Sequence, residues 1–191
     1  MFKFSQSVRQ IFYLNFAIFL ITLFSPSVIN LLSLNDFSSE NFKIYQLITY
    51  QFTHVDFWHI FFNMLALVSF GPDVENRYGS KNFWIYYLIC GIFAGLIQIS
   101  LIHYPIVGAS GSIFGILSIY TLFNPNQKLY LYFIVGLRAK YLIGSIFIYE
   151  LAKSIFPTVG DSTAHIAHVS GGLMGVIIFL LEKIRNRWIN Y

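Results

Sequence analysis

Charged residues are scarce in this sequence. Asp, Glu, Lys and Arg make up 10% of its 191 residues, whereas 57% are hydrophobic and the mean hydropathy is +0.65. A soluble domain carries about 25% charged residues, and this chain has too few to cover a core of 21 Phe and 13 Tyr. The composition therefore excludes an ordinary soluble domain and predicts an integral membrane protein whose solvent is the lipid bilayer.

Cysteine is nearly absent as well. The single cysteine, Cys90, lies in an apolar stretch, which excludes a disulfide framework and a zinc knuckle. The net charge of +4 would suggest acidic partners in a soluble protein. In a membrane protein the cations are better explained by orientation in the bilayer, so we expect no nucleic-acid partner.

Apolar runs separated by short polar breaks fill most of the chain. They predict an all-α membrane protein of six spans, folded as a single domain over residues 1–191. The first run has no small-residue cleavage site and is interpreted as a retained anchor. The predicted helices cover residues 10–34, 59–74, 83–102, 110–123, 141–156 and 164–182.

The polar breaks predict the orientation. Residues 128–137 are apolar but too short to span, and Arg138 and Lys140 follow them, so we expect this segment along the membrane interface. With both termini cytoplasmic, every Lys and Arg except Lys43 and Lys153 lies on the inner side, as the positive-inside rule requires. The loops at 35–58, 103–108 and 157–163 then face outward.

The fourth predicted helix, residues 110–123, is too short to cross the bilayer. About 14 residues at 1.5 Å each reach roughly 21 Å, whereas the hydrocarbon core is about 30 Å thick. Its first residue therefore lies below the outer surface. Irregular backbone at that depth is tolerated only inside protein or beside a water-filled cavity, and we expect residues 107–110 to border such a cavity.

Ser110 opens this short helix, within Gly108-Ala109-Ser110-Gly111. Unpaired amides and the positive end of the helix dipole meet there, which favours binding of an oxyanion. Alternatively, Ser110 only caps the helix, while Gly111 and Gly115 let a neighbouring helix pack closely. The motif alone is compatible with both.

The last helix carries two histidines followed by glycines. Gly171 and Gly175 lie three and seven positions after His168 and form one smooth face for a partner backbone. That spacing places His168 at the contact, where an imidazole can move a proton at neutral pH. His165, one turn earlier, is the alternative base. A histidine bonded to a neighbouring carbonyl is the structural alternative.

His59 and Asn63, four residues apart in the second predicted helix, share one face. An imidazole N–H and an amide NH₂ on one face can both point at a developing oxyanion, although the pair could also only bridge helices. We expect no metal at His59, His165 and His168, because the sequence has no HExxH motif and no helix is expected to add a carboxylate at ligand spacing.

Taken together, these motifs resemble those of the rhomboid family over nearly the whole chain. Their order and separation are similar to the minimal six-helix bacterial form. The matching residues are His59 and Asn63 in HxxxN, Gly71, Glu75 and Gly79 in GxxxExxxG, Gly108 to Gly111 in GASG, and His168, Gly171 and Gly175 in HxxGxxxG.

The resemblance implies an intramembrane serine endopeptidase with a six-helix rhomboid bundle around a short central fourth helix. Ser110 would be the nucleophile and His168 the base, with no acidic third member. His59, Asn63 and the Ser110 amide would form the oxyanion hole. The residues implied to pack the active site are Gly108, Gly111, Phe114, Gly171 and Gly175.

The same resemblance implies transmembrane protein substrates, no cofactor and no metal, and a bacterial inner membrane with both termini in the cytoplasm. Substrate would approach past the fifth helix and under the 157–163 loop. Glu75 and Arg77 would have structural roles at the inner face. One departure is Tyr45-Gln46, where many family members carry Trp-Arg, and it affects how the first outer loop is anchored.

Two other functions compete with proteolysis. A non-catalytic rhomboid-like protein that binds transmembrane clients would share the packing motifs, but it usually lacks the serine or the histidine, and both are present here. A small transporter with a histidine proton relay would need an intramembrane acid. Glu150 is the one candidate, and we expect it to pair with Lys153 three residues later.

Overall fold

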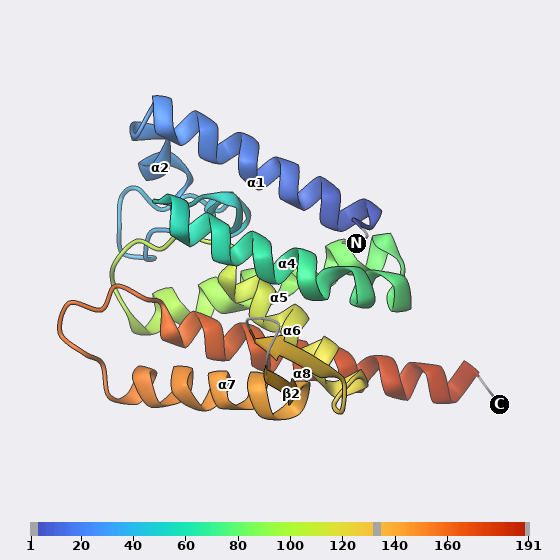
Figure 1. Ribbon diagram of the computed structural model, residues 1–191. Coiled ribbons are helices and arrows are strands. Elements are labelled where there is room, and N and C mark those ends of the chain that lie inside the picture. Colours follow the sequence, from blue (N-terminus) through green and yellow to red (C-terminus); the bar gives the residue numbers. More distant parts are fainter. Residues whose placement is uncertain (1–3, 132–134, 190–191) are drawn as a thin grey trace.

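Long helices run side by side in this protein (Figure 1). The computed structural model describes residues 4–131 and 135–189, and the two ends of the chain lie at the same end of the bundle. The helices are α1 (Gln6–Phe24), α2 (Ser27–Leu32), α3 (Gln46–Thr49), the 3-10 turn η1 (Tyr50–Phe52), α4 (Phe57–Tyr78), α5 (Ser80–Leu101), α6 (Ser110–Phe123), α7 (Ala139–Ile155) and α8 (His165–Ile189).

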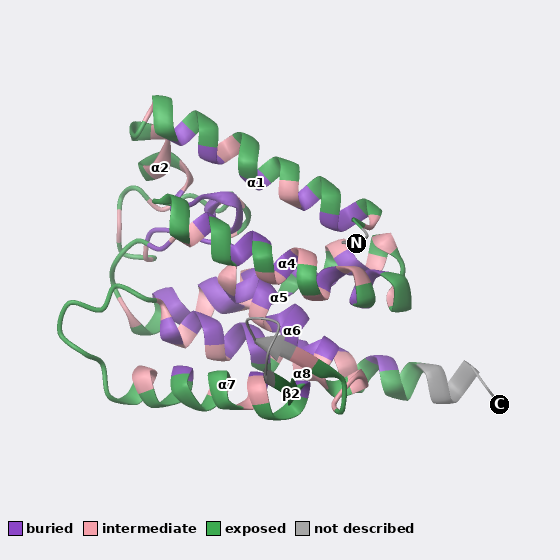
Figure 2. Ribbon diagram, viewed as in Figure 1, coloured by how far each residue is buried: buried purple, intermediate pink, exposed green. Residues whose placement is uncertain are grey.

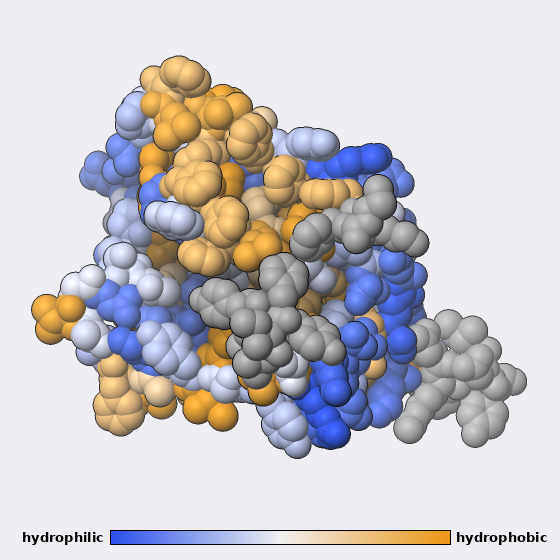
Figure 3. Space-filling model, in the orientation of Figure 1, coloured by the Kyte–Doolittle hydropathy of each residue, from blue (hydrophilic) through white to orange (hydrophobic). Residues whose placement is uncertain are grey.

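Three helices in the described part of the chain are long and apolar enough to cross a membrane. They are α1, α5 and α8. Their candidate spans are Gln6–Phe24, Ser80–Leu101 and His165–Arg185. On the face seen in Figure 3, apolar side chains gather over α1 and α4, and hydrophilic ones gather where α1 begins and α4 ends. The prediction of an all-α membrane protein is confirmed, apart from one short hairpin.

The first predicted helix is two helices. α1 ends at Phe24 and α2 begins at Ser27, with Pro26 between them. Proline has no amide to continue the hydrogen-bond ladder, so the prediction of one helix over 10–34 was wrong. The helix predicted over residues 110–123 is confirmed as α6, and the other helix ends differ from prediction by a few residues, except that α8 continues to Ile189.

The expected interfacial segment at 128–137 is a β-hairpin. Strand β1 (Lys128–Leu131) pairs antiparallel with β2 (Val135–Arg138), so that Lys128 lies opposite Arg138 and Leu129 opposite Leu137. Pairing satisfies backbone N–H and C=O groups of the two strands. Residues 132–134 lie outside the described part of the chain.

The core centres on α6, which is buried along most of its length and packs against α4, α5, α7 and α8. Figure 2 shows the contrast between this centre and the outer helices α1 and α7, whose outward faces are exposed. Glycines allow the helices to pack this closely around α6, because a side chain at Gly115 would overlap Cys90 and one at Gly111 would overlap Ala94. A central helix without room around it can hold its first residue in a fixed place.

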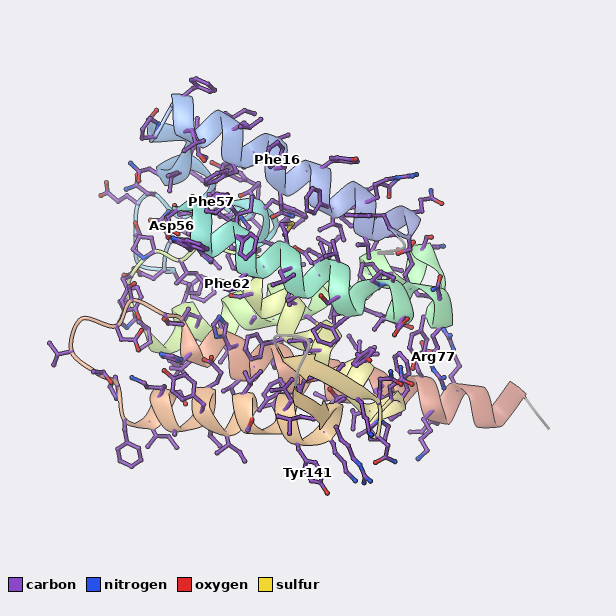
Figure 4. The ribbon with its side chains drawn as sticks, viewed as in Figure 1. Phe16, Asp56, Phe57, Phe62, Arg77 and Tyr141 are labelled. Carbon is purple, nitrogen blue, oxygen red and sulfur yellow. The ribbon has the colours of Figure 1, made fainter. Side chains whose placement is uncertain are left out.

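Glu75 joins the beginning of α1 to the end of α4. Its carboxylate accepts hydrogen bonds from the Ser7 amide at 2.7 Å, the Val8 amide at 3.1 Å and the hydroxyls of Ser5 and Ser80. An anion at a helix N-terminus satisfies free amides and the helix dipole. Nearby, the Arg77 guanidinium lies 4.9 Å from the centre of the Phe123 ring, at the last turn of α4 (Figure 4). Both residues have the structural roles expected of them.

Candidate active site

Ser110 and His168 lie in hydrogen-bonding contact. Ser110 is the first residue of α6 and His168 lies in the first turns of α8, and Ser110 Oγ is 2.7 Å from His168 Nε2. Ser110 is half-buried and His168 is 9% exposed. A hydroxyl against an imidazole nitrogen at this distance is the geometry in which a histidine can take the serine proton.

Two glycine pairs bring these helices together. A Cβ at Gly171 would overlap the carbonyl oxygen of Gly111, and a Cβ at Gly175 would overlap that of Gly115. α6 and α8 therefore touch backbone to backbone along the face that the glycine spacing predicts. Because main-chain atoms cannot swing aside, this contact fixes how far Ser110 lies from His168.

Phe114 lies one turn after Ser110 and stacks on the His168 ring. The two ring centres are 4.4 Å apart and their planes differ by 6°. Phe114 also makes a T-shaped contact with Phe147 from α7, at 5.2 Å between ring centres. Stacking on a flat ring limits rotation of the imidazole, which keeps Nε2 directed at Ser110.

The segment before α6 is held by backbone contacts. Gly108 has φ +123° and its amide donates to the carbonyl of Tyr50 at 2.9 Å. A Cβ at Gly108 would come within 2.6 Å of His59 Nε2. Glycine is thus required here twice, once for the left-handed backbone and once for the close approach of the imidazole.

His59 lies beside this segment at the beginning of α4. Asp56 caps the helix by accepting from the His59 amide at 2.9 Å (Figure 4). One turn later, Asn63 Nδ2 donates to the His59 carbonyl at 2.8 Å, within α4 itself. The structure therefore places His59 next to Gly108, and Asn63 one turn farther along the same helix.

His54 makes a contact with this segment that the sequence does not reveal. It is fully buried, its ring meets the edge of the His59 ring at 4.8 Å, and its Nε2 accepts from the Ala109 amide at 3.4 Å. Burial lowers the pKa of His54 to about 3, so it stays neutral and can accept this bond. Its contact with the Ala109 amide positions the residue before Ser110.

Glu150 is the site residue for which the sequence prediction was wrong. Its Oε2 lies 2.9 Å from His168 Nδ1 and 2.6 Å from His165 Nδ1. The expected pair with Lys153 is not formed, because Lys153 Nζ lies 3.4 Å from Asp161 Oδ2 instead. The expectation that no acid contacts the serine and histidine is also contradicted. Glu150 is the single buried acidic residue of α7, but its direction around that helix was not predicted.

His165 faces carboxylates on both sides. In addition to Glu150 at Nδ1, its Nε2 lies 3.1 Å from Asp161 Oδ2 in the loop before α8. The hydrogen bond from His165 lowers the pKa of the Asp161 carboxyl below its ordinary value. Both ring nitrogens of His165 are therefore occupied by contacts that do not involve Ser110.

Glu150, His165 and His168 are also a possible metal-binding set. Each offers one ligand atom, and these atoms all lie within 4.8 Å of one another. The expectation that no helix adds a carboxylate at ligand spacing is thus wrong, because α7 brings Glu150 to the two histidines. The Oε2 to Nδ1 distances of 2.6 and 2.9 Å are those of hydrogen bonds.

A cavity of about 550 Å³ lies in the first outer loop, away from Ser110 and His168. Its lining residues are Asn30, Leu31, Ser33, Asn35, Glu40, Asn41, Lys43, Tyr45, Gln46 and Pro105. Gln46 is buried there and its Nε2 donates to the Asn41 carbonyl at 3.0 Å. The aqueous cavity expected beside residues 107–110 stays a prediction.

Comparison with known proteins shows which family the chain belongs to. The family model of the rhomboid domain matches residues 41–183. The chain is 34% identical over 141 residues to rhomboid protease GluP of Bacillus subtilis, covering 73% of this chain and 27% of GluP. It is 30% identical to mitochondrial rhomboid protein 1 of Saccharomyces cerevisiae, covering 66% of this chain and 38% of that protein.

A third relative, rhomboid protease GlpG of Haemophilus influenzae, is 23% identical over 171 residues, which is 85% of this chain and 82% of GlpG. The chain thus spans less than half the length of the yeast protein and of GluP but most of the length of GlpG. Because the family model covers most of the sequence, the chain belongs to the rhomboid family, as an integral membrane protein.

Proposed function

We propose that this chain is an intramembrane serine endopeptidase in which Ser110 is the nucleophile and His168 the general base. The observation that carries the proposal is the 2.7 Å contact between Ser110 Oγ and His168 Nε2. Two relatives that bear the name protease, GluP and GlpG, support the same reaction class. Gly108, Gly111, Phe114, Gly171 and Gly175 are the residues that pack the site.

The reaction follows from this contact. Ser110 Oγ attacks the peptide carbonyl while its proton moves to His168 Nε2, and the carbonyl oxygen becomes an oxyanion. The free amide of Ser110 at the beginning of α6, the His59 imidazole and the Asn63 amide are the proposed donors to that oxygen. His168 then gives the proton to the leaving amine, and water hydrolyses the acyl-enzyme.

His168 is a better base than His165 in this arrangement. His168 Nε2 faces Ser110, whereas both nitrogens of His165 face carboxylate oxygens at 2.6 and 3.1 Å. A nitrogen that already donates to a carboxylate has no lone pair to accept the serine proton. His165 is therefore assigned to support the site.

The proposed membrane arrangement has six spans in one domain over residues 1–191. The spans are α1, α4, α5, α6, α7 and α8, with both termini in the cytoplasm of a bacterial inner membrane. Both chain ends lie at one end of the bundle (Figure 1), which fits an even number of spans. Ser110 then lies below the outer surface, and water reaches it from the outer side.

The proposed substrates are transmembrane helices of other proteins. An intact helix hides its carbonyls in backbone hydrogen bonds, so segments with helix-breaking residues are favoured. The proposed path runs past α7, of whose seventeen residues Ala139, Ile143 and Glu150 are buried. The loop above it is exposed and contains Gly160 at φ +83°, which suits a movable cover.

The test combines labelling with cleavage. Purified protein is treated with a fluorescent fluorophosphonate and, in parallel, reconstituted with a transmembrane reporter peptide. We expect Ser110→Ala and His168→Ala to lose labelling and at least about 10³-fold in cleavage rate, and His165→Ala to keep labelling. Ser118→Ala, a buried serine two turns later on α6, is the matched control and should label normally.

Two results would reject the assignment. Equal labelling of the unaltered chain and of Ser110→Ala would reject Ser110 as the nucleophile. Loss of labelling in His165→Ala alone, with His168→Ala intact, transfers the role of base to His165. Binding of the reporter without cleavage by the unaltered chain would support the non-catalytic alternative.

A further inference from the structure

Glu150 is a buried carboxylate on a helix that is otherwise largely exposed. Glu150 is 7% exposed, and its Oε2 lies between the Nδ1 atoms of His165, at 2.6 Å, and His168, at 2.9 Å. Removing a carboxylate from water is costly unless hydrogen bonds replace the lost hydration. The two imidazoles supply that replacement, and in doing so they are themselves oriented.

The contact with Glu150 decides which nitrogen of His168 carries the proton. A carboxylate oxygen accepts hydrogen bonds, so His168 must donate from Nδ1. A neutral imidazole has one N–H, which leaves the lone pair on Nε2, 2.7 Å from Ser110 Oγ. This is the tautomer that a general base needs. In the other neutral tautomer the hydrogen is on Nε2 and points at the nucleophile.

His165 is the second partner of the Glu150 carboxylate. Its two ring nitrogens lie within hydrogen-bonding distance of carboxylate oxygens, Glu150 Oε2 and Asp161 Oδ2. Lys153 lies 3.4 Å from Asp161. The two carboxylates thus have basic partners other than His168, and His165 bridges them.

We propose that Glu150 is a positioning residue that completes an acid–histidine–serine chain with His168 and Ser110, while the second contact, with His165, holds the Glu150 carboxylate in place. This rests on the proposed function. As Ser110 attacks, its Oγ–H bond breaks and an Nε2–H bond forms on His168. The resulting imidazolium lies beside the Glu150 carboxylate, which stabilises the charge and neither gains nor loses a proton. The proton leaves Nε2 with the amine product.

The first test separates catalysis from stability. Glu150→Gln keeps the size of the side chain and removes its charge, so we expect kcat for a transmembrane reporter peptide to fall about 10- to 1000-fold, with KM within about twofold. Glu182→Gln is the matched control. Glu182 is also 7% exposed and accepts from Tyr86 at 2.5 Å, but it lies four turns beyond His168, about 21 Å along α8.

The second test is a readout that a purely structural contact would leave in place. The rate of fluorophosphonate labelling is measured against pH. Without the carboxylate the imidazolium formed during attack is less stable, so the rise of labelling with pH should move to lower pH in Glu150→Gln. The groups that face His168 are Glu150 of α7, His165 of α8 and His59 of α4, with Asp161 and Lys153 beyond His165. All except Glu150 are the same in both proteins.

The outcomes are distinct. An unchanged kcat and an unchanged pH profile in folded Glu150→Gln overturn the proposal and leave the proposed protease intact. If the unaltered chain neither labels nor cleaves, both this proposal and the proposed protease function are rejected. If Glu150→Gln does not fold, the Glu150→Asp variant is tested instead. Its carboxylate is withdrawn by one methylene, so kcat should fall at constant KM, and a kcat equal to that of the unaltered chain contradicts the proposal.

A metal at this cluster is tested separately. If activity is lost on chelation and restored by Zn²⁺, the cluster holds a metal, and the proposal is overturned.

Discussion

The contact of α8 with α6 differs in kind from its contact with α7. Against α6, the glycines at 171 and 175 meet the carbonyl oxygens of Gly111 and Gly115, which are backbone atoms. Against α7, Gly172 meets the ring of Phe147, a side chain that can turn. The first contact holds the serine against the histidine, whereas the second holds a helix that is exposed over most of its surface (Figure 2).

This difference assigns separate tasks to the two contacts. A rigid α6–α8 pair suits groups that must stay within hydrogen-bonding distance through the reaction. A more weakly packed α7 suits a helix that gives way to a substrate, yet it also carries Glu150, which lies against both histidines. Under our proposals, movement of α7 would therefore change the orientation of the base as well as the access to it.

The largest effect is expected from Gly171→Ala. The added methyl group would overlap the Gly111 carbonyl, so α6 and α8 must separate. A displacement of about 1 Å can cost about 10²-fold in rate, and we expect a loss of that size together with a lower melting temperature in detergent. The measurement is reporter cleavage per folded molecule, and an unchanged rate would show that this contact does not position the site.

Gly172→Ala should be milder, although it adjoins the same position. Its methyl group would meet the Phe147 ring, which can rotate away from α8. We expect a smaller loss of activity than for Gly171→Ala and a melting temperature closer to that of the unaltered chain. The two variants are compared in the same detergent, and equal or reversed losses would break the distinction between the α6 and α7 contacts.

Gly144→Ala, within α7, should stabilise the folded protein, unlike the two glycine substitutions in α8. A Cβ at Gly144 meets no heavy atom within 4 Å, and replacing a helical glycine by alanine gains about 0.5–1 kcal/mol in the free energy of unfolding. We expect a slightly higher resistance to unfolding and normal labelling of Ser110. A clear loss of stability would mean that α7 packs more tightly than described.

The smallest effect concerns Asp161, which is exposed. Its hydrogen bond with His165 lowers the pKa of the carboxyl, so the ionised form stabilises the folded state. That contribution is complete above the ordinary pKa of about 3.9 and is lost as the pH falls below it. Asp161→Asn should therefore lower the melting temperature at pH 7 and match the unaltered chain more closely near pH 3. A difference that grows on acidification would contradict this sign.

Much of the helix layout could be predicted from the sequence, because apolar runs and their breaks mark helices in a lipid-facing chain. The 14-residue helix beginning at Ser110 is an example. The break at Pro26 was missed although Ser25, Pro26 and Ser27 interrupt the apolar run, and the hairpin after Lys128 was missed because its strands are as apolar as the neighbouring helices. Hydropathy does not separate a strand from a helix in such stretches.

The site was predictable to different degrees. The spacing of His168, Gly171 and Gly175 indicates a close helix contact because small residues mark where backbones can approach. Glu150 could not be placed, because α7 is apolar on its outer and inner faces alike and its pattern does not show which side meets α8. Its partner histidines also lie across a loop, so spacing along the chain carries no information on the contact.

The central claim is that Ser110 is activated as a nucleophile by contact with His168. The most direct measurement is peptide mapping by mass spectrometry of the protein after it reacts with a fluorophosphonate in a membrane-like detergent. The account predicts a single adduct on the Oγ of Ser110, absent from His168→Ala. An adduct on a different residue, or an unmodified Ser110 in folded protein that cleaves its reporter, would contradict it.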